Sequence, residues 1–154
     1  MSYPFILVVE DNPDHLELTV ETFRDVGVKV LIEIAQDGVQ ALDFLFARAG
    51  HADRSVADLP AFVLLDIKLP RLSGIEVLRQ IRANPATALV PVIMLTSSTE
   101  RSDMAACYAA GANSFVHKSV DFGLYAEKLE CLQVYWLRVN ESVPSDTCFV
   151  PLID

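Results

Sequence analysis

The chain has 154 residues, of which 52% are hydrophobic and 21% are charged, a balance typical of one globular domain with a real core and not of a disordered chain. Its formal net charge of −9 argues against binding to nucleic-acid phosphates, and no apolar run approaches the length of a membrane span. The three cysteines, Cys107, Cys131 and Cys148, lack metal or redox spacing, and the N-terminus has no secretion-signal pattern, so we expect reduced thiols and a cytoplasmic protein.

The first third of the chain alternates between strand and helix signals. Residues 5–9 form an uninterrupted apolar run, which predicts a buried strand. Asn12 suits the N-cap of the following helix, Pro13 suits its first turn, and Gly27 suits its end. Residues 29–34 then predict a second strand.

The middle of the chain continues this alternation. A strongly apolar surface over residues 39–46 predicts a second helix, and the polar residues 50–60 predict a long loop. Residues 61–65 are apolar and run straight into Asp66. Because a buried strand does not hold an unpaired ionised carboxylate in its interior, Asp66 is expected at the carboxyl end of this third strand. Residues 74–84 predict the third helix.

The last third contains two further strand–helix pairs. Residues 91–96 predict a fourth buried strand, and the alanine-rich residues 100–110 predict a helix that Gly111 closes. Residues 113–117 predict a short fifth strand, and a long last helix follows from Phe122 to about residue 140. The pattern therefore contains five strand–helix repeats.

Five such repeats predict an α/β fold with a doubly wound, five-stranded parallel sheet and helices on both faces. Acidic residues end the first and third strands, which fits the flavodoxin-like order 2-1-3-4-5, whose switch point lies between those two strands. The strand order is inferred by analogy with known doubly wound proteins. We expect one domain over residues 1–140 and a C-terminal extension over residues 141–154.

Acidic side chains gather at the predicted switch point. Glu10 and Asp11 follow the first strand, and Asp66 ends the third. Three neighbouring carboxylates repel one another unless a cation lies among them, and an all-oxygen site of this kind suits Mg²⁺. The alternative is that the acidic pair only caps a helix and that Asp66 is an ordinary loop residue. Thr96 and Lys118 end the fourth and fifth strands and favour a functional site.

These motifs together resemble the receiver domain of two-component response regulators. The resemblance rests on the acidic pair, on Asp66 followed by Leu69-Pro70 and Ser73-Gly74, and on the threonine and lysine after the last two strands. It extends over about residues 5–140. The segment from Lys118 to Phe122, with Tyr135-Trp136-Leu137 and Asn140-Glu141 downstream, is similar to single-domain regulators that serve phytochrome histidine kinases.

The resemblance implies a role for each site residue. Asp66 would be the phosphoacceptor and would form an acyl phosphate. Mg²⁺ would be held by the carboxylates of Asp11 and Asp66 and by the backbone carbonyl of Lys68, with Glu10 acting through a metal-bound water. Lys118 would offer a positive charge to the phosphoryl oxygens.

The resemblance also implies a switch. The Thr96 hydroxyl would move toward the phosphoryl group, and the aromatic side chain of Phe115 would rotate into the space left behind. The alternative for Phe115 is plain core packing. Ser119 stands where the family usually has a proline after the lysine, and a cis bond before serine costs about 2.5–4 kcal/mol. We therefore expect a trans Lys118–Ser119 bond. His15, His51 and His117 have no metal spacing and are expected at the surface or at strand ends.

The last helix is too apolar for a single packing face, which predicts a homodimer. The expected inner stripe is Phe122, Tyr125, Leu129, Leu132 and Trp136. The expected interface is the opposite side of the helix together with an apolar tail that crosses to the partner. Its residues are Leu124, Cys131, Val134, Tyr135, Phe149, Val150, Leu152 and Ile153. The alternatives are that the tail folds back on its own domain or that it is disordered.

The favoured function is a single-domain response regulator that catalyses only its own phosphoryl transfer and dephosphorylation. Its donor would be a sensor histidine kinase, with a phytochrome as the candidate, and its output would be protein contacts without nucleic acid or membrane. The alternatives are an aspartyl-phosphate phosphatase-type enzyme and a phosphorelay intermediate. A phosphatase of this type needs a second acid two residues after Asp66, where Lys68 stands. A flavin-binding protein needs a phosphate-cradling loop after strand one, where Glu10 and Asp11 would repel phosphate.

Overall fold

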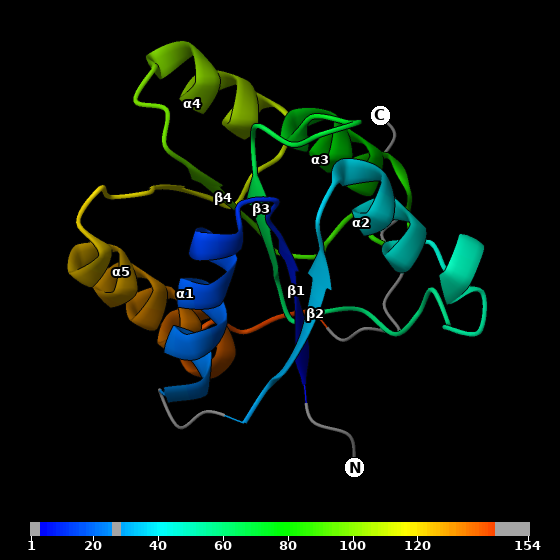
Figure 1. Ribbon diagram of the computed structural model, residues 1–154. Helices are drawn as coiled ribbons and strands as arrows, with labels where there is room; N and C mark the ends of the chain where they lie inside the picture. Colours follow the sequence, from blue (N-terminus) through cyan, green and yellow to red (C-terminus); the bar gives the residue numbers. More distant parts are fainter. Residues whose placement is uncertain (1–3, 26–28, 144–154) are drawn as a thin grey trace.

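The computed structural model describes residues 4–25 and 29–143 of the chain. These residues form five strands in one parallel sheet of order β2-β1-β3-β4-β5, as predicted. The strands are β1 (Phe5–Val9), β2 (Leu31–Ala35), β3 (Val63–Asp66), β4 (Val92–Thr96) and β5 (Ser114–His117). β2 and β5 are the two edges, and β1 and β3 lie side by side (Figure 1).

Helices connect the strands in sequence. They are α1 (Pro13–Asp25), α2 (Gly38–Leu45), α3 (Gly74–Ala83), α4 (Arg101–Ala109) and α5 (Phe122–Val134). A short 3₁₀ helix, η1 (Ala49–His51), interrupts the predicted polar loop. Side-chain oxygens cap four of the helices, since Asn12, Asp37, Ser73 and Asp121 each accept a hydrogen bond from a backbone N–H in the first turn.

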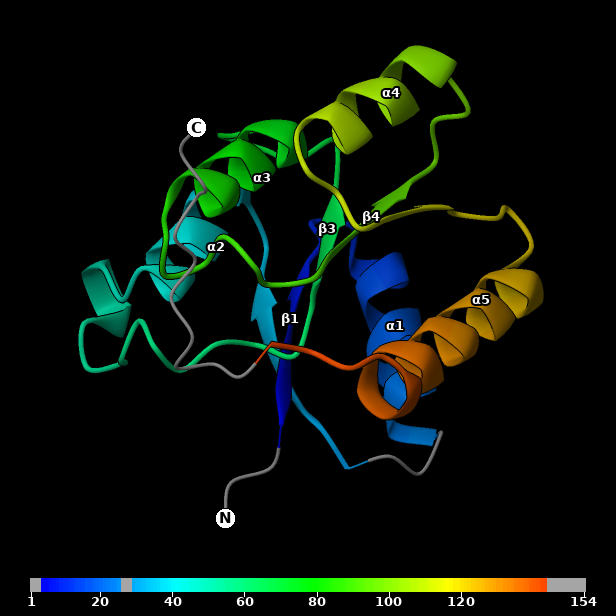
Figure 2. The ribbon, with the colours of Figure 1, turned by 180° about the vertical axis from the view of Figure 1, so that it is seen from behind.

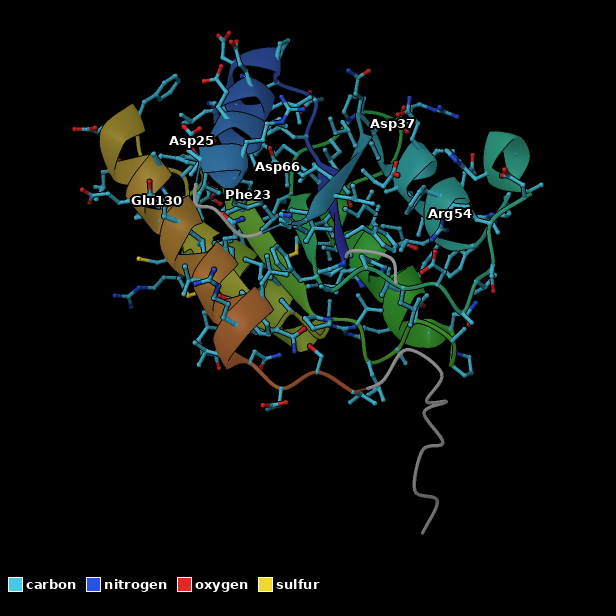
Figure 3. All side chains as sticks on the ribbon, turned by 90° about the horizontal axis from the view of Figure 1, so that it is seen from below. Phe23, Asp25, Asp37, Arg54, Asp66 and Glu130 are labelled. Atoms are coloured by element: carbon cyan, nitrogen blue, oxygen red, sulfur yellow. The ribbon has the colours of Figure 1, made fainter. Side chains whose placement is uncertain are left out.

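Helices cover both faces of the sheet (Figures 1 and 2). α1 and α5 lie side by side on one face and pack on Ile6, Val8, Leu64 and Ile93. α2, α3 and α4 pack on the other face, where alternate residues of the same strands point. Phe23 of α1, labelled in Figure 3, is fully buried and meets the ring of Phe62 edge-on, with ring centroids 6.4 Å apart. The three central strands, β1, β3 and β4, are thus buried on both faces, as their unbroken apolar runs predict, whereas the edge strand β2 is largely exposed.

Several element boundaries differ from the prediction by one or two residues, as at β3, which begins at Val63 and not at residue 61. β2 begins and ends later than residues 29–34, at Leu31 and Ala35. The last helix does not continue as an α-helix to residue 140, because α5 ends at Val134 and a π-helical segment, η2 (Tyr135–Val139), follows. Periodicity alone cannot detect this change, because the apolar spacing continues through both segments.

Most of the predicted inner stripe of α5 is confirmed. Tyr125, Leu129 and Leu132 are buried, and Trp136 packs against the same cluster. The prediction is wrong for Phe122, which is 48% exposed. Phe122 is the first residue of α5 and meets the ring of His15 edge-on instead of entering the core.

The opposite side of α5 is exposed, as expected: Leu124, Cys131, Val134 and Tyr135 are all accessible. The four predicted tail residues, Phe149, Val150, Leu152 and Ile153, lie outside the described residues. No helix in the described part of the chain has the length and apolar character needed to cross a membrane.

Candidate functional site

The predicted site residues meet at the carboxyl edge of the sheet. Asp66 is the last residue of β3 and Thr96 the last of β4, while Glu10 and Lys118 directly follow β1 and β5. All four are buried, with exposed fractions of 9% for Asp66, 3% for Glu10, 5% for Lys118 and 1% for Thr96. Parallel strands end at one edge, so four separate stretches of the sequence converge there (Asp66 is labelled in Figure 3).

The start of α3 packs closely against the strand end that carries Asp66. The N–H of Gly74, at the start of α3, donates a hydrogen bond of 2.8 Å to the carbonyl of Ile67. A Cβ at position 74 would lie only 2.0 Å from the Asp66 carbonyl oxygen. The glycine in the Ser73-Gly74 motif therefore allows α3 to approach the strand end that carries Asp66.

A buried ion network joins three of the predicted residues. The ammonium of Lys118 donates a 2.8 Å hydrogen bond to Asp66 Oδ2 and a second hydrogen bond to Glu10 Oε1. The backbone N–H of Lys118 also donates to the Thr96 carbonyl at 2.7 Å. Two carboxylates thus share one ammonium group, which leaves excess negative charge in a poorly solvated place.

Burial raises the pKa of Glu10 to about 7, because desolvation outweighs the attraction of the Lys118 ammonium. Glu10 therefore takes up a proton near neutral pH when no cation is bound. The carboxyl also accepts a 3.3 Å hydrogen bond from the N–H of Asn12, the residue directly before α1.

The three acids can approach a single cation. One carboxylate oxygen from each of Glu10, Asp11 and Asp66 lies within 4.8 Å of the others. Asp11 is exposed, so the cluster opens to solvent on one side. An all-oxygen set with an open side matches the preference of Mg²⁺ and Mn²⁺ for carboxylate and water ligands. Lys68, whose carbonyl was predicted as a further ligand, has an exposed side chain just beyond Asp66.

The two predicted switch residues lie next to this network. Thr96 Oγ1 accepts a 3.0 Å hydrogen bond from the N–H of Ser98. Phe115 of β5 is half-buried and packs on the core cluster beneath α2, α3 and α4. The described residues contain no cis peptide bond, so the Lys118–Ser119 bond is trans, as predicted.

One residue at the site was not predicted. His15 was expected at the surface or at a strand end and was not named as a site residue. Its side chain is 26% exposed, and its Nδ1 lies 3.0 Å from Lys118 Nζ. His15 occupies the first turn of α1, five positions after Glu10. This spacing places the ring over the end of β1. The spacing is visible in the sequence, but the histidines were considered there only as metal ligands.

Comparison with known proteins identifies the family. Residues 6–130 match the response regulator receiver domain family. The probable methanogenesis regulatory protein FilR2 of Methanothrix harundinacea is 39% identical over 90% of this chain and 88% of its own length. Response regulator Rcp1 of Synechocystis is 31% identical over 86% of this chain and 88% of its own length.

Solved structures agree with the fold. The phosphorylated cyanobacterial phytochrome response regulator RcpA superimposes with a TM-score of 0.86 at 26% identity, over 92% of this chain and 99% of RcpA. The Mn²⁺-bound form of Rcp1 superimposes with a TM-score of 0.85 at 28% identity, over 91% of this chain and 99% of Rcp1. With a family match over most of its length and relatives above 30% identity, this chain belongs to the response regulator receiver domain family.

Proposed function

We propose that the chain is a single-domain response regulator that accepts a phosphoryl group on Asp66 from a sensor histidine kinase. The observation that carries this proposal is the buried contact between the Lys118 ammonium and Asp66 beside the three-carboxylate cluster. A phytochrome is the proposed class of kinase, because the similar protein RcpA is a cyanobacterial phytochrome response regulator. Residues 1–140 would form the receiver and residues 141–154 an interaction arm, and the protein would act in the cytoplasm.

The proposed chemistry begins with the Asp66 carboxylate. One of its oxygens forms a bond to the phosphorus of a phosphohistidine while the phosphorus–nitrogen bond breaks, and the electron pair of that bond stays with the leaving imidazole. Burial of Asp66 restricts water around the reacting oxygen. The Lys118 ammonium, already 2.8 Å from Asp66, would transfer one of its hydrogen bonds to a phosphoryl oxygen.

Asp11 and Asp66, with the Lys68 carbonyl and with Glu10 acting through water, are the proposed ligands of Mg²⁺. The bound ion would neutralise negative charge on the phosphoryl oxygens. The fit rests on the donor set, which is entirely oxygen, and on the short separation of the three carboxylates. The Mn²⁺-bound structure of Rcp1 supports a divalent cation in this family.

Thr96 and Phe115 are the proposed switch. The Thr96 hydroxyl accepts a bond from Ser98 and keeps its own proton to donate to a phosphoryl oxygen. A shift of Thr96 toward Asp66 would open space near β5, which the half-buried ring of Phe115 could fill. Signalling would then follow from the changed surface around β5.

We propose a second copy of the chain as one partner of that surface. A hollow of about 660 Å³ lies between β5 and α5, and its lining includes Val116, Leu124, Cys131 and Tyr135. This is the exposed apolar side of α5. Leu124→Glu should lower the dimer fraction by adding charge to the hollow, whereas Leu31→Glu, on the opposite edge strand, should not. Light scattering at tens of micromolar would show this, and a monomeric wild-type chain, phosphorylated or not, would contradict it.

The alternative functions have weaker support. A phosphatase-type enzyme needs a general acid two residues after the nucleophile, and the residue there is Lys68, whose exposed side chain is a cation. A phosphorelay intermediate would use the same Asp66 and differ only in passing the phosphoryl group onward. Transfer from the phosphorylated chain to a second histidine-containing protein would favour that alternative.

The direct test is incubation with acetyl phosphate and Mg²⁺. The proposal predicts one phosphoryl group per chain, stable in acid and labile in base as an acyl phosphate is. Asp66→Asn should abolish the label while the fold is retained, because the side chain keeps its size and polarity. An unlabelled wild-type chain, or equal labelling of the variant, would contradict the proposal.

A further inference from the structure

The ring of His15 forms the third contact of the Lys118 ammonium. Nδ1 of His15 lies 3.0 Å from Lys118 Nζ, and the same Nδ1 lies 3.6 Å from Glu10 Oε1. The other two contacts of the ammonium are Glu10 and Asp66. An ammonium group has three N–H donors and no acceptor. Its three protons therefore have three acceptors, two of them carboxylates and one an imidazole nitrogen.

This arrangement assigns the state of the imidazole. Nδ1 can accept from an ammonium only if it carries no proton, so His15 is neutral with its proton on Nε2. The pKa of His15 is lowered by burial and then by the charge of Lys118, which agrees with a neutral ring. His15 therefore adds an acceptor to the site without adding charge.

The ring is held in place from two sides. Its face lies along the ring of Tyr125 and its edge meets Phe122, with centroid separations of 6.1 Å in both cases. The His15 N–H donates to Asn12 Oδ1 at 3.2 Å, and the His15 carbonyl accepts from Thr19 Oγ1 at 2.8 Å. Contacts from α1 and α5 thus leave the imidazole little freedom to turn away from the ammonium.

The backbone of Lys118 is fixed separately. Its N–H donates to the Thr96 carbonyl, and the ammonium of Lys128 donates to the neighbouring carbonyl of His117 at 2.9 Å. These bonds locate the start of the Lys118 side chain, whereas the position of the ammonium depends on its contacts with Glu10, Asp66 and His15. A contact at the far end is needed to define where the ammonium lies.

We propose that His15 is a positioning residue that holds the Lys118 ammonium during phosphoryl transfer. The inference rests on the proposed function. When Asp66 receives a phosphoryl group, the ammonium must exchange its bond with Asp66 for one with a phosphoryl oxygen. Its bond to His15 is not involved in that exchange and can persist throughout. His15 therefore acts as a fixed pivot, attached to α1 and independent of the reacting carboxylate.

The test compares three variants with the wild-type chain. His15→Ala removes the acceptor, and His15→Asn keeps an acceptor oxygen one bond beyond Cγ, where Nδ1 stands. His51→Ala removes a histidine that packs on Phe44, on the other face of the sheet. The readouts are the phosphorylation rate with acetyl phosphate over a range of Mg²⁺, the Mg²⁺ affinity, and the ¹H–¹⁵N signal of the Lys118 ammonium, assigned with Lys118→Arg.

Loss of one hydrogen bond to a charged group predicts a rate about five-fold lower or more for His15→Ala, at saturating Mg²⁺ as well as below it. The Mg²⁺ affinity should stay within about two-fold, since a neutral acceptor contributes little to cation binding. His15→Asn should restore most of the rate and His51→Ala should leave it unchanged. The Lys118 ammonium signal should broaden through faster exchange with water in His15→Ala and return in His15→Asn.

Three results would overturn the inference: an unchanged rate in His15→Ala, equal losses in the alanine and asparagine variants, or a loss that disappears at saturating Mg²⁺. Equal losses would mean that ring packing matters and not the acceptor. A wild-type chain that takes no phosphoryl group would refute the proposed function instead. In that case the ammonium signal alone still decides whether His15 holds Lys118.

Discussion

Replacing Lys118 with methionine tests the buried ion network most sharply. The ammonium is 5% exposed and is shared by Glu10 and Asp66. Methionine has a similar length and no charge, so the variant leaves two buried carboxylates facing each other. Removing one partner of a buried ion pair costs about 3–5 kcal/mol of the free energy of unfolding. The Lys118 ammonium lowers the Glu10 pKa, so its removal raises that pKa further above about 7 and makes ionisation of Glu10 more costly. We therefore expect the loss to approach that size without metal as the pH rises to about 8 and above.

Two conditions should relieve this loss. Below the Glu10 pKa of about 7, the Glu10 carboxyl takes up a proton and the repulsion falls, so the difference between variant and wild type shrinks as the pH drops. Saturating Mg²⁺ should reduce the difference too, since a cation replaces the missing positive charge. Asp66→Asn should behave in the opposite way and leave stability without metal unchanged or higher, because one carboxylate then remains for one ammonium.

The assay is urea unfolding followed by circular dichroism, in chelator or in Mg²⁺, at about pH 6 and about pH 8. The free energy of unfolding should depend on the urea concentration with a similar slope in all variants, so that differences in the transition midpoint report differences in stability. A Lys118→Met variant as stable as the wild type at about pH 8 in chelator would show that Lys118 does not compensate the buried carboxylates. The description of the site as one coupled network would then be wrong.

Two further predictions concern the metal and the backbone. The apparent affinity for Mg²⁺ should fall as the pH drops through about 7, because protons that bind Glu10 compete with the cation. Isothermal titration calorimetry would measure this affinity, and an affinity that stays constant between about pH 6 and about pH 8 would contradict the prediction. Gly74→Ala should destabilise the fold by about 2 kcal/mol or more, because its Cβ would lie 2.0 Å from the Asp66 carbonyl oxygen. Gly50→Ala is the matched control, with no neighbouring atom within 4 Å of an added Cβ, and equal thermal shifts in the two variants would refute the close-approach argument.

Much of the fold was predictable because its strands are apolar on both faces. Unbroken runs such as residues 5–9 and 61–65 locate the strands of a parallel sheet, and the polar residue after each run marks its carboxyl end. Once the sheet is parallel, these ends share one edge. The convergence of Asp66, Thr96 and Lys118 therefore follows from sequence pattern and topology together.

The rest depended on contacts that no pattern records. The contact of His15 with Lys118 joins residues 103 positions apart in the chain, so it requires the relative placement of α1 and β5. The exposure of Phe122 has a similar origin. Phe122 fits the apolar spacing of the helix, but it is the first residue of α5 and lies outside the core. The change from α5 to the π-helical segment at Tyr135 has no signature in the apolar spacing.

The central claim is that Asp66 carries the phosphoryl group. The most direct measurement is peptide mapping by tandem mass spectrometry after phosphorylation by a histidine kinase and reduction of the acyl phosphate with borohydride, which converts the modified aspartate to homoserine. The account predicts conversion at Asp66 alone, dependent on Mg²⁺ and absent from chains that were never phosphorylated. Conversion at another carboxylate, such as Asp11, with Asp66 unmodified, would contradict the account.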